Sequence, residues 1–330
     1  MIPLAERSWD VVALGEALID LLPSRVGPLA HVPSFERHTG GAPANVAIGA
    51  ARLGARCAFV GAVGEDPFGT YLQDAFRAEG VDAAAVMRVE GRRTGVAFIS
   101  LNEAGQPHFL SMGGGAELCV TSEVATRAPV EDARVFHLGS YILSAEPSCS
   151  AAMASVRRAG AAGTWVAFDP NLRLHFWRDH SRLRAAVDDL VPQSDVLKIS
   201  SEECEFITGT PDPLQAAKIL IKRGPRLVVV TTGALGCAYA RRTSGSVETG
   251  TVPTRRAKVL DSTGAGDGFL AALLVGMTRR LIAGEDALEI AILRLEKLLA
   301  LANEAGARVC EHVGAVPGLP RASEFPSLDV

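Results

Sequence analysis

Short apolar stretches alternate with longer amphipathic stretches along most of the chain. Six runs rich in Val, Ile, Leu and Phe have the length of buried strands, at residues 11–15, 57–61, 133–139, 164–169, 195–200 and 226–233. Between such runs, apolar residues recur at helical spacing and end in glycine, as helices commonly do, at 45–54, 71–80, 150–160 and 214–224. Alternating strands and helices predict an α/β fold whose mainly parallel sheet is covered on both faces.

Two stretches interrupt this alternation. Residues 16–41 and 91–117 have the pattern of strands and turns with no helix between them, and NEAGQP at 102–107 is typical of a hairpin turn. We expect the two stretches to meet as one small sheet over the edge of the main domain. A sheet in that place would act as a lid that excludes water from a site beneath it.

Composition excludes several classes of protein. The 330 residues suffice for one elaborated α/β domain or two ordinary ones, and 48% hydrophobic residues indicate a full core. A net charge of −4 without a block of like charge argues against a nucleic-acid or membrane surface. No apolar run approaches about 20 residues, and Glu6 and Arg7 lie where a signal peptide needs an apolar core, so we expect a cytoplasmic protein.

Cysteines and histidines give no sign of a metal centre. The six cysteines form no CxxC pair, which fits thiols in a reducing compartment. The seven histidines show no HExxH or other metal spacing, and the closest pair is His175 and His180. We interpret these histidines as structural.

The stretch DSTGAGDGFLAALL, at 261–274, begins a helix with very little side chain. Gly264, Ala265 and Gly266 leave bare backbone N–H groups at a helix start, where the helix dipole also favours negative charge. This pattern predicts an anion site. Asp267 would repel an anion unless it takes up a proton nearby, so it is a candidate general base. The alternative is that Asp267 only complements the dipole and the glycines form a tight turn.

A second glycine cluster, TGGAPANVAIG, opens a helix in the N-terminal third. Gly40 and Gly41 let backbone approach a ligand, and Asn45 offers a donor and an acceptor to hydroxyl groups; a tight turn into the helix is the alternative. Upstream, Asp20 lies between apolar residues, where an uncompensated carboxylate is costly to bury. Asp20 would suit a pair of sugar hydroxyls, or it is an ordinary exposed strand position.

Two polar segments directly follow predicted strands, KISSEE at 198–203 and TTGALG at 231–236. Ligands of open parallel sheets bind outside the carboxyl ends of the strands. We therefore expect both segments to line one crevice together with the GAGD motif. The chain has no GxxxxGK[ST], HRD or DFG, so neither a Walker-type NTPase nor a protein kinase is supported.

Taken together, TGGAPANVAIGAARLGARCAFVGAVGEDPFG and DSTGAGDGFLAALL resemble the two signature motifs of the ribokinase-like (PfkB) carbohydrate kinases. The resemblance runs from about Val11 to about Pro320. The stretches GEALIDLLP, FDPNLRLHFW, VLKISSEE and LANEAGARVCEHVGAVPGLP further resemble the bacterial fructokinase branch. This resemblance implies a ribokinase-like three-layer αβα fold with a doubly wound, mainly parallel sheet and a small discontinuous β-sheet lid. It implies a single kinase domain over 1–330, with the lid formed by about 16–43 and 92–118.

The resemblance implies an ATP-dependent kinase that transfers the γ-phosphate to a sugar hydroxyl, with fructose as the leading substrate. Alternatives are 2-keto-3-deoxygluconate, another sugar, or a nucleoside. A non-catalytic sugar-binding regulator is a rival from another class, but such a protein has little reason to keep Asp267 with its glycines. The implied partners are a sugar and ATP, with no nucleic acid and no membrane. A homodimer through exposed lid edges is also implied.

The resemblance also gives individual residues roles. Asp267 would be the general base, and the N–H groups of Ala265, Gly266 and Asp267, just past Gly264, would hold the transferring phosphoryl group. The sugar would be bound by Asp20, Gly40, Gly41, Asn45 and Arg173, with Asn171 nearby. ATP and Mg²⁺ would be bound by Lys198, Glu203, Thr232, Gly233, Gly236 and Asn303. A monovalent cation such as K⁺ would be held by Asp261 together with backbone carbonyls near residues 305–313.

The sequence departs from the family pattern at two places. Ser200 stands where the family has the Asn of Asn-x-x-Glu, which weakens the expected contact of Glu203 with magnesium through water. Fructokinases usually carry an aromatic residue and an Arg in the lid, where this chain has Ser111, Met112 and Gly113. A nucleoside kinase would need an aromatic wall in the lid, for which the candidates are Phe35, Phe98 and Phe109.

Overall fold

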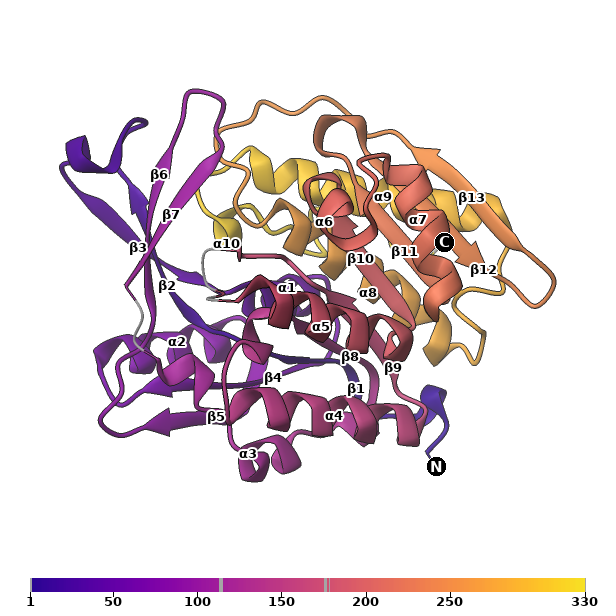
Figure 1. Ribbon diagram of the computed structural model, residues 1–330, viewed down its shortest axis with the longest axis horizontal. Coiled ribbons are helices and arrows are strands. Elements are labelled where there is room, and N and C mark those ends of the chain that lie inside the picture. Colours follow the sequence, from indigo (N-terminus) through magenta and orange to yellow (C-terminus); the bar gives the residue numbers. More distant parts are fainter. Residues whose placement is uncertain (1, 113–114, 175–176, 178, 330) are drawn as a thin grey trace.

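A computed structural model describes residues 2–112, 115–174, 177 and 179–329. Its main sheet has nine strands in the order β13-β12-β11-β10-β9-β8-β1-β4-β5 (Figure 1). All neighbours from β11 to β5 pair in parallel, and the β12 and β13 pairings are antiparallel. The bounds are β1 (Trp9–Leu14), β4 (Cys57–Gly64), β5 (Val81–Val89), β8 (Ala133–Gly139), β9 (Trp165–Asp169), β10 (Val196–Ser200), β11 (Leu227–Thr231), β12 (Cys237–Arg242) and β13 (Val247–Val252).

Helices cover both faces of this sheet. Along β1, Val11 and Ala13 belong to one buried cluster and Val12 and Leu14 to another, so the strand faces two cores. The first cluster includes residues of α1, α2, α8 and α9, and the second includes residues of α3, α4, α5, α6 and α7. The expected three-layer α/β architecture is therefore confirmed. The helices are α1 (Ala42–Arg52), α2 (Pro67–Ala78), α3 (Ser122–Arg127), α4 (Ser148–Ala162), α5 (His180–Leu190), α6 (Cys204–Thr208), α7 (Pro213–Leu220), α8 (Ala265–Ile282), α9 (Ile292–Cys310) and α10 (Ala315–Gly318).

One predicted helix end is wrong. The helix expected to end at Gly160 continues to Ala162 and stops before Gly163, whose φ of +70° is left-handed. A Cβ on Gly160 would meet open space, so packing does not require glycine at this position of α4. A glycine ends a helix only where the backbone turns left-handed, and the residue type does not show this by itself. In the part of the chain that the structure describes, no helix is both long and apolar enough to cross a membrane.

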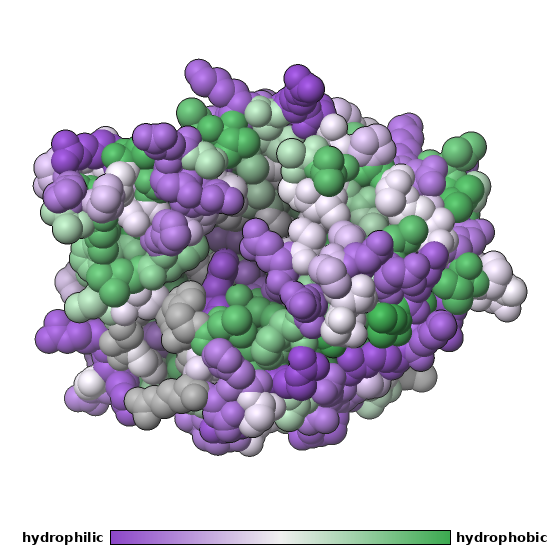
Figure 2. Space-filling model, turned by 45° about the horizontal axis from the view of Figure 1, so that its top comes forward, coloured by the Kyte–Doolittle hydropathy of each residue, from purple (hydrophilic) through white to green (hydrophobic). Residues whose placement is uncertain are grey.

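The second sheet is the lid, with strand order β3-β2-β6-β7. Its strands β6 and β7 form the predicted antiparallel hairpin around 102–106. The register places Asp20, Ala97 and Ser111 beside one another across β2, β6 and β7, so these side chains share one face. Figure 2 shows a hollow between the lid and the layered body, with hydrophilic residues at its bottom. The bounds are β2 (Leu18–Pro23), β3 (Phe35–Gly40), β6 (Val96–Leu101) and β7 (Pro107–Met112).

The tip of the lid hairpin rests on the loop that precedes α8. The carbonyl of Gly105 accepts hydrogen bonds from the backbone N–H and the Oγ of Ser262, at 3.0 and 3.3 Å. Gly105 has a φ of +72°, and a Cβ there would lie 2.9 Å from a Val259 methyl group. Only glycine fits this close approach, which ties the lid to the start of the GAGD motif.

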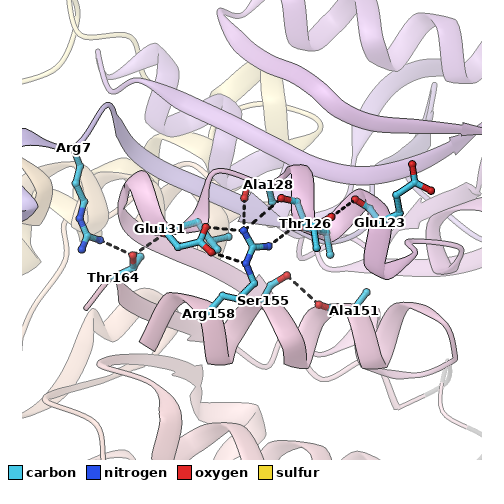
Figure 3. A network of polar contacts seen from close by, with 11 residues as sticks. Arg7, Glu123, Thr126, Ala128, Glu131, Ala151, Ser155, Arg158 and Thr164 are labelled. Atoms are coloured by element: carbon cyan, nitrogen blue, oxygen red, sulfur yellow. Dashed lines mark hydrogen bonds and ion pairs between the residues drawn. The ribbon is translucent and has the colours of Figure 1, made fainter. Parts of the chain in front are cut away.

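A polar network anchors the place where the chain returns from the lid (Figure 3). Arg158 on α4 donates to the carbonyls of Ala125 and Ala128 at the end of α3, at 2.7 and 3.2 Å. The same guanidinium pairs with Glu131 at 2.6 Å. The last carbonyls of a helix have no intrahelical partner, so Arg158 satisfies groups that would otherwise be left bare.

Candidate active site

One cavity lies between the lid, the carboxyl ends of β1, β8 and β9, and the first turns of α1 and α8. It contains most of the residues predicted to bind sugar. Asp20, Gly41, Asn45, Asn171, Arg173, Gly264 and Asp267 all line it. The other lining residues are Glu16, Leu18, Ala42, Ala97, Phe109, Ser111, Gly139, Ser140, Tyr141, Pro170 and Thr263.

The first turn of α8 has the geometry of an anion site. Gly264 is the residue before the helix, with a φ of +78°, and a Cβ there would lie 2.2 Å from the Cβ of Ala315. A Cβ on Gly266 would lie 2.7 Å from the Lys198 ammonium nitrogen, so the cation sits directly over the turn. The N–H groups of Gly266 and Asp267 donate to no described residue, whereas that of Ala265 donates weakly to the Ser262 carbonyl at 3.3 Å. Two free N–H groups and a lysine therefore converge on one point.

Asp267 lies at the same end of the cavity and is only 6% exposed. Its Oδ2 accepts a hydrogen bond from Asn45 Nδ2 at 2.8 Å. Burial raises the pKa of Asp267 to about 6, against the opposing effects of the Asn45 hydrogen bond and the Lys198 charge. A carboxyl group with this pKa is mostly ionised at neutral pH and is more basic than an exposed aspartate, as general base catalysis requires.

Asn45 differs from the simple expectation of a sugar ligand, because its donor group is directed at Asp267. Its Oδ1 is buried and has no hydrogen-bond partner among the described residues. Asn45 therefore orients Asp267 with one end of the amide and offers an acceptor to the cavity with the other.

The Gly40–Gly41 pair is required by close packing against β2 and the turn before it. A Cβ on Gly40 would lie 2.4 Å from the Asp20 carboxyl group, and one on Gly41 would lie 2.3 Å from the Glu16 carbonyl. The Asp20 side chain itself is 5% exposed, and no described residue donates a hydrogen bond to it. Burial raises the pKa of Asp20 to about 7, partly offset by the Arg173 charge. Its carboxyl oxygens are thus left for a ligand.

A buried ion pair lies between the cavity and the end of β10, where ATP is expected to bind. Lys198 donates to Asp169 Oδ2 at 2.8 Å, and both side chains are almost fully buried. Burial is the largest single effect and lowers the pKa of Lys198. The charges of Asp169, Glu203 and Asp267 and the hydrogen bond to Asp169 together outweigh it, so the pKa is raised. Lys198 is therefore held as a cation beside the α8 turn. Sequence reasoning missed Asp169.

The carboxylate of Glu203 is occupied by backbone groups. It accepts hydrogen bonds from the N–H groups of Leu172 and Ser200, at 2.5 and 2.7 Å. The unusual Ser200 belongs to this capping box at the end of β10. Glu203 thus holds the β9 and β10 loops together, and its chemistry fits a contact to Mg²⁺ through water rather than direct ligation.

The remaining predicted ATP residues lie around the turn after β11. Gly236 has a φ of +99°, and a Cβ there would lie 2.1 Å from the Val252 carbonyl. Asn303 donates to the same carbonyl at 3.0 Å, which brings it to this turn. Thr232 donates from its N–H to the Gly236 carbonyl at 2.8 Å, and Gly233 lies inside the turn. None of these four lines the cavity, which agrees with a separate nucleotide crevice over β10 and β11.

Asp261 organises the loop that leads into α8. It is fully buried, and its Oδ1 accepts from the N–H and Oγ1 of Thr263 at 2.8 and 2.6 Å. Its Oδ2 accepts from the N–H of Gly314 at 2.8 Å. A buried acid without a cationic partner among the described residues fits a site for a monovalent cation.

The lid departures fall on both faces of β7. Ser111 lines the cavity with a buried Oγ that has no described partner, whereas Met112 is 57% exposed on the other face. Gly113 lies outside the described residues. Of the three aromatic candidates for a nucleoside-binding wall, Phe109 lines the cavity with the Arg173 guanidinium 5.1 Å from its ring centroid. Phe35 and Phe98 pack on each other at 5.2 Å and do not line the cavity.

Of the closest histidine pair, His180 does not line the cavity. His180 is at the first position of α5 and contacts the Leu174 carbonyl, and His175 lies outside the described residues. Among the described residues, no group of three or more His, Cys, Asp or Glu side chains could hold a metal ion.

Sequence reasoning also missed Glu16, Ser140 and Tyr141, which line the cavity. The signal that could have found them is their place, because Glu16 lies just past β1 and Ser140 directly follows β8. Residues at the carboxyl ends of parallel strands are the usual ligand contacts of such sheets.

Comparisons with known proteins identify the family of this chain. Residues 9–322 match the pfkB family of carbohydrate kinases. Fructokinase-1 from Oryza sativa subsp. japonica is 38% identical over 329 residues, covering 98% of this chain and 99% of that protein. The crystal structure of a fructokinase with bound ATP from Xylella fastidiosa has a TM-score of 0.83 and 32% identity, covering 97% of this chain and 98% of the other. A double mutant of the fructokinase from Vibrio cholerae O395, with fructose, ADP and potassium bound, has a TM-score of 0.79 and 31% identity over 94% of each chain. The chain therefore belongs to the pfkB family of carbohydrate kinases and is a sugar kinase.

Proposed function

We propose that this sugar kinase transfers the γ-phosphate of ATP to a hydroxyl group of fructose. The observation that carries the proposal is the cavity that brings Asp267 next to the free N–H groups and the lysine at the start of α8. The fructose and ADP bound in the Vibrio cholerae fructokinase support this choice of substrate and nucleotide product.

In the proposed reaction, Asp267 takes the proton of the attacking sugar hydroxyl. The hydroxyl oxygen forms a bond to the γ-phosphorus, and the bond from that phosphorus to the β–γ bridging oxygen breaks, so ADP leaves. The N–H groups of Gly266 and Asp267, with Lys198, stabilise the charge on the transferring group. Asn45 keeps the Asp267 carboxylate directed at the hydroxyl.

We propose that the predicted nucleotide residues keep their roles. Lys198 meets the phosphates, and the turn of Thr232, Gly233 and Gly236 lines the nucleotide crevice, with Asn303 behind it. Mg²⁺ would neutralise the phosphates, with Glu203 reaching it through water. The buried Asp261 would help to hold K⁺, which is the ion in the Vibrio cholerae structure. Use of ATP supports a cytoplasmic protein, and the whole chain would act as one kinase domain.

The experiment is ADP release with Mg²⁺ and ATP over a panel of fructose, other ketoses, aldoses, 2-keto-3-deoxygluconate and nucleosides. We expect fructose to give the highest kcat/KM. Ser111 would then be a tolerated lid variation, because its hydroxyl can still contact the sugar. Turnover of a nucleoside above fructose would contradict the proposal and point to Phe109 and Arg173 as a wall for a planar base. Binding of a sugar without turnover would instead indicate a regulator.

We also propose a homodimer formed through the lids. The strand β7 is an edge of the lid sheet, and its outward side chains Leu110 and Met112 are 51% and 57% exposed. An apolar, unpaired edge strand favours pairing with a second copy. Small-angle scattering at micromolar concentration tests this, and a monomer would contradict it.

A further inference from the structure

The strand order places the two substrates along one row of strand ends. Lys198 lies on β10 and Asp169 is the last residue of β9. Ser140 directly follows β8, and Glu16 lies two residues past β1. Neighbouring strands are about 4.8 Å apart, so β1 is about 14 Å from β10 along this row. The β8–β1 end of the cavity is thus remote from the nucleotide side.

This remote end holds polar groups that no described residue satisfies. The Glu16 carboxyl accepts the Ala42 N–H with Oε1 at 3.1 Å, but its Oε2 is buried without a partner among the described residues. The same holds for the Ser140 hydroxyl. Both residues line the cavity. Unsatisfied buried polar atoms are costly, so groups of this kind that converge on a cavity indicate a polar ligand.

Tyr141 lines the same end of the cavity, and a buried glutamate fixes the direction in which its hydroxyl group donates. The Tyr141 hydroxyl donates to Glu117 Oε1 at 3.1 Å, and Glu117 is only 3% exposed. Glu117 comes from the segment that follows the last lid strand, and a Cβ on Gly95 would already lie 3.1 Å from it, so its side chain has little room to move. A tyrosine oxygen that donates its proton to a carboxylate can still accept a hydrogen bond, so Tyr141 can act as an acceptor at this end of the cavity.

We propose that Glu16, Ser140 and Tyr141 form a hydroxyl-binding subsite for the end of the sugar opposite to the phosphorylated hydroxyl, and that Glu117 is its positioning residue. This inference rests on the proposed sugar kinase function and adds what selects the sugar. Acceptors dominate the subsite, so it selects a neutral sugar with a hydroxyl at that end. A substrate that places a carboxylate there would face the Glu16 carboxyl group, with the Glu117 carboxyl group beyond Tyr141. Arg173, which follows β9, is the only cation among the described residues that line the cavity.

The test compares single-atom changes in the protein with single-atom changes in the sugar. Product analysis by ³¹P NMR first identifies the phosphorylated hydroxyl. Steady-state kinetics then compare fructose with the deoxyfructose that lacks the terminal hydroxyl at the opposite end. Tyr141→Phe should raise the fructose KM about tenfold, as expected for one lost hydrogen bond, with the ATP KM and kcat within about twofold. The wild-type enzyme should use the deoxy sugar about tenfold less well, and Tyr141→Phe should reduce this difference to about twofold.

Two further variants separate positioning from folding. Glu117→Gln keeps an acceptor for the Tyr141 hydroxyl and should retain the wild-type KM, whereas Glu117→Leu should raise it about as much as Tyr141→Phe. The matched control is Tyr239→Phe, because the Tyr239 hydroxyl also donates to a glutamate, Glu296 at 2.8 Å, far from the cavity. Tyr239→Phe should leave the sugar KM unchanged.

The outcomes distinguish this inference from the proposed function. Normal turnover of fructose with equal penalties for the deoxy sugar in the wild type and in Tyr141→Phe would overturn the subsite and leave the kinase function standing. A kcat/KM for 2-keto-3-deoxygluconate at or above that for fructose would overturn both the subsite and the choice of fructose, and would leave the sugar kinase activity standing. Failure of the wild-type enzyme to use any neutral sugar would overturn both.

Discussion

Replacing Asp267 with Asn should lower the catalytic rate and raise the stability of the protein. A residue with only a structural role would not give this combination. Asn has the same shape, and its side-chain oxygen can still accept the hydrogen bond from Asn45. The variant loses the general base, which is worth about 10²- to 10⁴-fold in rate. We therefore expect Asp267→Asn to lower kcat at least about 100-fold with the sugar KM within about threefold.

The same substitution should stabilise the protein at alkaline pH. Burial raises the pKa of Asp267 from its ordinary value of 3.8 to about 6, so ionising this group opposes folding. The difference corresponds to at most about 3 kcal/mol above pH 6, and it vanishes below about pH 4, where the carboxyl is protonated in the folded and the unfolded chain. The wild-type protein thus loses stability relative to Asp267→Asn as the pH rises from 4 to 6.

The assay is a thermal melt of both proteins from pH 4 to pH 8, together with kcat at pH 8. Asp267→Asn should melt several degrees higher at pH 8 and equal to the wild type near pH 4. A retained kcat would show that Asp267 is not the base. A lower melting temperature of Asp267→Asn at every pH would show that the carboxylate is satisfied in the folded protein, which would refute the electrostatic argument.

Asp20→Ala should raise the sugar KM at least about tenfold and leave the ATP KM within about twofold; equal effects on both would indicate a folding defect. Gly266→Ala places a methyl group 2.7 Å from the Lys198 nitrogen, so kcat should fall at least about tenfold, whereas Gly160→Ala in α4 meets open space and should leave kcat unchanged and raise stability by about 0.5–1 kcal/mol. The pH profile of kcat/KM should fall on the acid side with an apparent pKa near 6, and a profile that is flat from pH 5 to pH 8 would argue against Asp267 as the base. Replacing K⁺ with a large organic cation should reduce activity, and equal activity would contradict the role of Asp261.

The sequence predicts the centre of the main sheet better than its edges. The six predicted strands are confirmed because a strand covered on both faces is a continuous apolar run. The strand β5 is rich in Ala, and the β12–β13 hairpin alternates with polar and small residues, so their patterns are weak. These strands are stabilised by hydrogen bonds and packing with the strands next to them in the sheet, and the local sequence pattern does not show which strands will be neighbours.

The candidate site was predictable where the chain itself departs from ordinary composition. The glycines before Asp267 and Asn45 predict a close approach of the backbone to a ligand. Asp20 is a carboxylate between apolar residues, which indicates a special role. In contrast, Glu16, Ser140 and Tyr141 are ordinary residue types that matter only because β1 and β8 lie side by side. The contact of Asn45 with Asp267 likewise depends on packing of α1 against α8. The sequence shows which residue types are present, but which side chains contact one another depends on the fold.

The docked lid tip sets how often the sugar site meets bulk water. The Gly105 carbonyl holds the tip by two hydrogen bonds from Ser262, each worth about 1 kcal/mol net. Breaking both costs about 2 kcal/mol, so a few per cent of molecules are open at any moment. Hairpins of this size move within microseconds to milliseconds. Sugar entry and product release therefore need only brief fluctuations of one hairpin, and for most of the time the docked lid keeps water from competing with the sugar for the phosphoryl group.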